Sequence, residues 1–158
     1  MAPHEHTYSV QVEWTGNRGS GTSDYRAYGR EHTISAAGKP DIAGSSDPAF
    51  RGNAERWNPE DLLVASASAC HQLWYLHLCA DAGVRVLRYV DRATGTMRDG
   101  ERGRFTRIVL RPHVVIRAGD DADLAARLHH DAHAHCYVAN STNFPIDCEP
   151  VIEQAAAA

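Results

Sequence analysis

The feature that most constrains the fold of this chain is the helix start Asn-Pro-Glu-Asp at residues 58–61. The asparagine can cap the free N–H groups of the first turn, the proline suits the first helical position, and the two acids face the positive end of the helix dipole. Gly83 is a typical C-terminal stop. These two signals predict one long helix that ends near Ala82.

Strand patterns precede this helix. Apolar and polar residues alternate along residues 8–14, which is the period of a half-buried strand, and a glycine-rich turn follows. Further strands around residues 22–28 and 32–36 would complete an antiparallel meander. Residues 37–57 hold too many glycines and prolines for regular structure, and a connection of this length is usually functional or wraps around a partner.

The segments after the helix predict two strands, at about residues 84–97 and 104–117, and then a second helix that starts at residues 120–121. A last short strand lies near residues 149–153. The order strands, helix, strands, helix, strand indicates an α+β fold. A length of 158 residues without a repeat or a linker predicts a single domain over residues 1–158.

Composition argues against several classes of protein. The net charge of −4 with neutral histidine gives no sign of nucleic-acid binding. No apolar run approaches the roughly 18 to 20 residues of a membrane span, and the N-terminus lacks the pattern of a signal peptide. We therefore expect a cytoplasmic protein with no membrane partner and with its four cysteines reduced. Such cysteines indicate thiol chemistry rather than a disulfide scaffold.

Two cysteines are candidates for that chemistry, Cys70 on the long predicted helix and Cys136 at the end of the second one. A nucleophilic cysteine must be a thiolate, and an ordinary thiol with a pKa of about 8.5 is only a few per cent ionised near neutrality. A guanidinium beside it would favour the charged form, and a carboxylate paired with that guanidinium would hold it in place. Arg18 on the glycine-rich turn and Glu60 at the helix start offer these groups.

The sequence resembles the OsmC/Ohr family of thiol peroxidases, in its broad OsmC-like branch. The matching pieces are Arg18–Thr22 after a tryptophan-ended strand, Asn58–Leu63 with a cysteine ten residues beyond Glu60, Ala134–Tyr137, and Asn140–Ser141. The resemblance covers about residues 7–153. It implies an OsmC-like fold, with antiparallel sheets around two central helices, in an intertwined homodimer that reduces organic hydroperoxides.

The resemblance also implies a role for each candidate residue. Cys70 would be the peroxidatic cysteine, Cys136 the resolving cysteine, Arg18 the partner of the thiolate and Glu60 the anchor of that arginine. The thiolate would become a sulfenic acid and then a disulfide, which an external dithiol would reduce; in the Ohr branch that dithiol is a dihydrolipoyl group. No cofactor is predicted. The chain departs from the family's peroxidases at His71, where they place an aromatic residue.

Helix geometry predicts how the site is assembled. Ten residues separate Glu60 from Cys70, which is about 15 Å along the axis and about 80° around it, too far for one arginine to serve both. Two antiparallel helices that cross near Ala65 would place residue 60 of one copy beside residue 70 of the other. We therefore predict a homodimer in which Cys70 and Cys136 come from one chain and Glu60 from its partner, with Arg18 between them.

Two other functions fit the same residues. His129 and His133 are one helical turn apart, with Cys136 within a further turn, so they could ligate zinc in a zinc-binding protein or a hydrolase. A non-catalytic, stress-associated dimer with the same fold is the third hypothesis. Cys79 and Cys148 have no neighbours in the sequence that suggest chemistry, and we expect both to serve packing.

Overall fold

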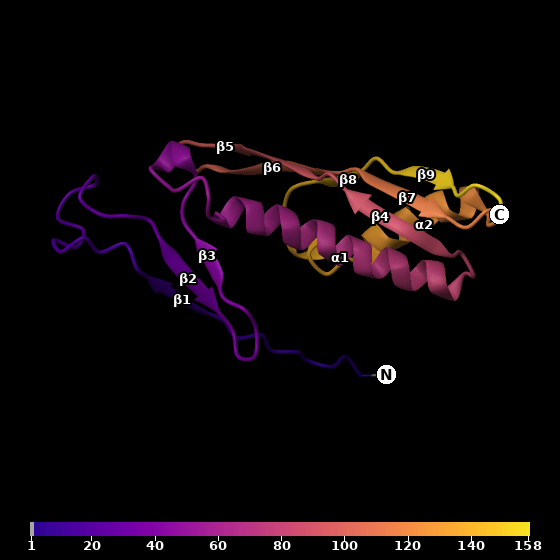
Figure 1. Ribbon diagram of the computed structural model, residues 1–158, viewed down its shortest axis with the longest axis horizontal. Coiled ribbons are helices and arrows are strands. Elements are labelled where there is room, and N and C mark those ends of the chain that lie inside the picture. Colours follow the sequence, from indigo (N-terminus) through magenta and orange to yellow (C-terminus); the bar gives the residue numbers. More distant parts are fainter. Residues whose placement is uncertain (1) are drawn as a thin grey trace. The chain divides into compact units, whose positions relative to one another are not determined.

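The computed structural model describes residues 2–158 as two compact units, of which the first ends at Leu62 and the second spans Leu63–Ala158 (Figure 1). The first unit is an antiparallel meander in the order β1-β2-β3. Its elements are β1 (Gln11–Trp14), β2 (His32–Ser35), β3 (Ile42–Gly44) and the short 3-10 helix η1 (Pro48–Phe50). The predicted meander is therefore present, but with different strands.

The strand predicted at residues 22–28 is wrong, because this segment forms turns. The guanidinium of Arg30 donates hydrogen bonds to the carbonyl oxygens of Tyr25 and Tyr28, both at 2.6 Å, and lies over both rings. An arginine side chain thus takes the carbonyl groups that a neighbouring strand would have bonded. β3 pairs with β2 in its place, although it lies in the segment that was predicted to be irregular.

The second unit combines two helices with two mixed sheets, ordered β4-β7-β9 and β5-β6-β8. Its strands are β4 (Val86–Asp91), β5 (Thr94–Arg98), β6 (Arg104–Leu110), β7 (Pro112–Ile116), β8 (Ile146–Cys148) and β9 (Val151–Gln154). Its helices are α1 (Pro59–Asp81), whose first turn belongs to the first unit, α2 (Ala122–His135) and the 3-10 helix η2 (Ala139–Ser141). The α+β fold is confirmed, but β8 and β9 pair in parallel with β6 and β7, so these sheets are not purely antiparallel.

Each of the two long strands predicted after α1 is divided into two. The interruption falls where the backbone N–H of Arg111 donates to the carboxylate of Asp91, at 2.6 Å, instead of to a strand. Pro112 follows directly and has no N–H to offer a ladder. Ser68 of α1 donates to the same carboxylate at 2.5 Å, so Asp91 connects the interrupted strands to the helix.

Both end signals of the long helix are confirmed. The side-chain oxygen of Asn58 accepts the N–H of Asp61 at 2.7 Å, which is the expected cap. Gly83 has a φ of 76°, a left-handed conformation that favours glycine, and the N–H of Val84 reaches back to the carbonyl of Cys79 at 2.9 Å. Within residues 2–158, no helix is both long enough and apolar enough to cross a membrane.

Two apolar clusters form the core of the second unit, where α1 and α2 lie along the strands (Figure 1). The larger cluster joins both helices to the β4-β7-β9 sheet and contains Tyr75, Cys79, Val84, Val114, Ile116, Ala125, Leu128 and Ala132. The smaller one joins α1 to β6 and β8 and contains Ala67, Ile108, Leu110 and Ile146. Cys70 lies on α1 between the residues that serve the two clusters.

Candidate functional site

The structure brings the two predicted redox cysteines together. Cys70 is half-buried on α1, whereas Cys136 is only 2% exposed at the C-terminal cap of α2. Burial raises the pKa of Cys136 to about 11, and the neighbouring Cys70 adds to this increase. Near neutral pH, Cys136 is therefore a protonated thiol with Cys70 as a neighbour.

The position of Cys136 follows from the way α2 ends. Asp121 caps the start of the helix by accepting the N–H of Leu124 at 2.9 Å. At the other end, the N–H of Cys136 bonds the carbonyl of His133 at 3.2 Å, and its sulfur accepts the N–H of Ala139 at 3.4 Å. The backbone turn into η2 thus holds this thiol facing inward.

Arg18 and Glu60 belong to the first unit. The side chain of Asn17 accepts the N–H groups of Gly19 and Gly21 at 2.9 and 3.0 Å, which builds the turn that carries Arg18. Arg18 is exposed, and Glu60 is half-buried in the first turn of α1. Among residues 2–158 of a single chain, no ion pair joins Arg18 to Glu60. Their roles beside Cys70 stay predictions.

Aromatic side chains lie next to the cysteine pair. Trp74 is one helical turn after Cys70, and its ring contacts that of Tyr137 with centroids 5.7 Å apart. Tyr137 directly follows Cys136 in the chain and is 71% exposed. With Leu73 and His77, Trp74 also lines a small cavity of about 260 Å³. An apolar molecule at the cysteines would therefore meet aromatic surface.

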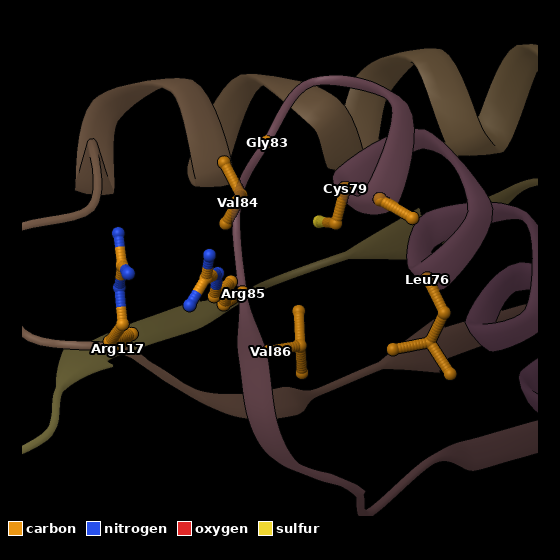
Figure 2. Close-up of a pocket in the computed structure, with 8 residues that line it drawn as sticks. Leu76, Cys79, Gly83, Val84, Arg85, Val86 and Arg117 are labelled. Carbon is orange, nitrogen blue, oxygen red and sulfur yellow. The ribbon is translucent and has the colours of Figure 1, made fainter.

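A larger cavity, of about 560 Å³, lies at the far end of α1 (Figure 2). Arg85 and Arg117 stand on one side of it and apolar side chains on the other, and Asp120 already pairs with Arg117 at 2.7 Å. Its only thiol, Cys79, is 1% exposed and packs in the core, and burial raises its pKa. The prediction that Cys79 serves packing is confirmed. Nine residues of helix, about 13 Å, separate it from Cys70.

His71, the residue that departs from the family pattern, faces the interior. It is 1% exposed, and its Nε2 lies 3.0 Å from Nδ1 of His129 on α2. The sulfur of Cys148 on β8 lies 3.7 Å from the first of these nitrogens and 3.9 Å from the second. Burial lowers the pKa of His71 to about 4 and that of His129 to about 3. Both imidazoles are therefore neutral near pH 7.

This cluster corrects the predicted metal ligands. In the described part of the chain, His71, His129 and Cys148 are the one group of three or more potential ligands whose ligand atoms lie close enough together to hold an ion. His129 is common to this group and to the predicted ligand set, whereas His133 and Cys136 do not belong to the group. Cys148 was assigned to packing, and it faces the two imidazoles instead. Without a prediction of β8, the sequence offered no signal that could place this cysteine.

Comparisons with known proteins agree with this fold. The family model for OsmC-like proteins matches residues 52–150. An OsmC-like protein of unknown function from Vibrio cholerae O1 biovar eltor is 28% identical, with a TM-score of 0.84 over 93% of this chain and 100% of that one. Organic hydroperoxide resistance proteins from Elizabethkingia anophelis and Legionella pneumophila share the fold. The first is 20% identical, with a TM-score of 0.65 over 96% of this chain and 100% of that one. The second is 18% identical, with a TM-score of 0.64 over 94% of this chain and 99% of that one. No curated protein matches the sequence significantly.

Proposed function

This chain belongs to the OsmC-like protein family, and from that membership and its cysteine pair we propose that it is a thiol peroxidase for organic hydroperoxides. The observation that carries the proposal is the proximity of Cys70 on α1 to Cys136 at the end of α2, although the two are 66 residues apart in the sequence. A two-cysteine peroxidase needs this arrangement, because the second thiol must reach the oxidised first one.

The proposed reaction is a two-electron transfer to the peroxide. The Cys70 thiolate attacks the terminal oxygen of the hydroperoxide, the O–O bond breaks, and the alcohol leaves after taking up a proton. Cys70 is then a sulfenic acid. The Cys136 thiol condenses with it, and the thiol proton and the sulfenic hydroxyl leave as water while the disulfide forms. An external dithiol, of which a dihydrolipoyl protein is one example, reduces the disulfide by exchange and restores both cysteines.

The state of Cys136 fits the resolving role. With its pKa raised to about 11, Cys136 is a thiol near pH 7, so it does not compete with Cys70 for the peroxide. It is also nearly inaccessible, at 2% exposure, whereas Cys70 is half-buried. Cys70 is therefore the more accessible of the two, as the peroxidatic role requires, and Cys136 is the protected thiol that the resolving role requires.

We place Arg18 and Glu60 in a site that two chains share. All four residues of β1 are exposed, and Val10, Val12 and Trp14 present apolar surface to solvent at 71%, 63% and 44%. Leu73 on α1 is 67% exposed. A sheet with a bare apolar face needs a second layer, and a second copy of the chain supplies one. Glu60 of that copy would then anchor the arginine beside Cys70.

Substrate preference follows from the aromatic surface beside the cysteines. Trp74 and Tyr137 can bury the organic group of a bulky hydroperoxide, and such burial contributes about 25 cal/mol per Å². Hydrogen peroxide has no group to bury. The proposed substrates are therefore organic hydroperoxides, and the predicted catalytic efficiency is higher for cumene hydroperoxide than for hydrogen peroxide.

The direct test is peroxide consumption with a dithiol as reductant. Wild-type protein should consume cumene hydroperoxide catalytically, and Cys70→Ser should lose this activity. Cys79→Ser is the matched control, because Cys79 lies on the same helix but packs in the core. It should keep the activity if it folds, which circular dichroism reports. Consumption by Cys70→Ser at the wild-type rate would overturn the assignment.

A further inference from the structure

We propose that His71, His129 and Cys148 bind a zinc ion, through Nε2, Nδ1 and Sγ respectively. These atoms come from α1, α2 and β8, and they lie within 4.8 Å of one another. The site is separate from the cysteine pair, and the inference does not depend on peroxidase activity.

The separations of the three atoms match those around a tetrahedral zinc ion. Zn–N bonds of about 2.0–2.1 Å and a Zn–S bond of about 2.3 Å hold two nitrogens about 3.3 Å apart, and a nitrogen and a sulfur about 3.6 Å apart. The corresponding separations in this protein are 3.0 Å between the nitrogens, and 3.7 and 3.9 Å from the sulfur to each of them. Each of the three separations is thus within about 0.4 Å of its value around a tetrahedral zinc ion.

Hydrogen bonds alone do not explain the whole arrangement. One between the imidazoles accounts for the 3.0 Å between His71 and His129, but the Cys148 thiol has one proton and can donate it to only one nitrogen, whereas its sulfur lies nearly equidistant from both. Two buried imidazoles beside a half-buried thiol are also costly unless they are compensated. A cation at their common point uses a lone pair of each.

The chemistry of the donors favours zinc. Two imidazole nitrogens and one sulfur are the ligands that zinc prefers, whereas calcium and magnesium require oxygen. Cys148 would release its proton to solvent as the ion binds.

The surroundings hold the ligands in place and leave a path to them. The ring of Tyr75 stacks on that of His129 with centroids 3.8 Å apart, and its hydroxyl bonds the carbonyl of Ala125 at 3.0 Å. His129 and Cys148 also line a cavity of about 340 Å³. Three protein ligands leave the fourth position of a tetrahedral ion free, and this cavity offers room for a water there.

Metal content and a cobalt spectrum test the site. Reduced protein, stripped with a chelator and reloaded with Zn²⁺, should hold one zinc per chain after dialysis, with a higher midpoint of thermal unfolding than the stripped form. Co²⁺ in place of Zn²⁺ should show the charge-transfer band of a thiolate ligand. Reloaded protein that keeps no zinc, or a cobalt complex without a thiolate band, would overturn the proposal.

Substitutions identify the ligands. His71→Ala and Cys148→Ser should each weaken zinc binding at least tenfold. His130→Ala and Cys136→Ser are the matched controls, an exposed histidine beside His129 and a buried thiol outside the cluster, and both should bind as wild type.

Cys148→His keeps the proposal testable if the first two variants do not fold. It replaces the sulfur ligand with a nitrogen ligand, so it should bind zinc but lose the thiolate band in the cobalt complex. A thiolate band that persists in Cys148→His would identify another cysteine as the ligand and contradict the assignment. Loss of zinc binding in Cys136→Ser, with binding kept in the Cys148 variants, would also contradict the assignment.

Discussion

At the scale of single residues, the two redox candidates differ in environment rather than in type. Cys70 is half-buried on α1, and Cys136 is enclosed by the backbone turn after α2. The sequence marked both positions through the resemblance, but the protonation state of Cys136 follows from burial and from its neighbour, which only the fold provides.

Alkylation of Cys136 should depend steeply on pH. Its pKa of about 11 means that the reactive thiolate fraction rises about tenfold per pH unit up to that value. Rates of iodoacetamide modification, followed by peptide mass mapping between pH 7 and 10, should show this rise. In Cys70→Ala the rise should start at lower pH, because one of the causes of the raised pKa is removed. A rate for Cys136 that levels off below pH 9 would contradict this environment.

At the scale of elements, the sequence predicted the ends of the long helix correctly but not the pairing of strands that lie far apart in the chain. The start and end of α1 were predicted because the cap at Asn58 and the left-handed Gly83 act within a few residues. The strand at residues 22–28 failed because the side chain of Arg30 competes for its carbonyls. β8 was missed because three residues became a strand only through parallel pairing with β6, far away in the sequence. The cluster of His71, His129 and Cys148 could not be predicted for the same reason, because Cys148 lies on β8.

The cap of α1 allows a quantitative check. Asn58→Ala removes the acceptor of the Asp61 N–H and should lower the free energy of unfolding by about 1 kcal/mol, as N-cap losses typically do. Denaturant unfolding of wild type and variant measures the difference. Asn58→Ser keeps an acceptor at this position and should recover most of the loss. Equal stability of the alanine and wild-type proteins would show that the cap contributes nothing.

At the scale of the whole molecule, residues 10–14, which include β1, expose apolar side chains that a second copy of the chain would cover in the proposed dimer. Val10 and Val12 would be expected inside a protein of this size, yet both are more than half exposed. The alternation in the sequence predicted a half-buried strand, and a second copy would supply the missing cover. The homodimer and the single domain stay predictions.

Mixed dimers test whether two chains share the site. Glu60→Ala and Cys70→Ser chains should each be impaired alone. After refolding together, a mixed dimer should contain one working site, made of Cys70 from the first chain and Glu60 from the second. With random pairing, about a quarter of the wild-type activity should return. Activity no higher than the average of the two parents, or a chain that is monomeric in solution, would contradict the shared site.

Mapping the product of one turnover tests the central claim most directly. Reduced protein treated with one equivalent of cumene hydroperoxide should lose two thiols per chain, and peptide mass mapping should find the Cys70–Cys136 disulfide. Addition of a dithiol should return both thiols. Cys79 and Cys148 should remain unoxidised in the same sample. A dominant disulfide that involves Cys79 or Cys148, or four unchanged thiols after peroxide treatment, would contradict the two-cysteine mechanism.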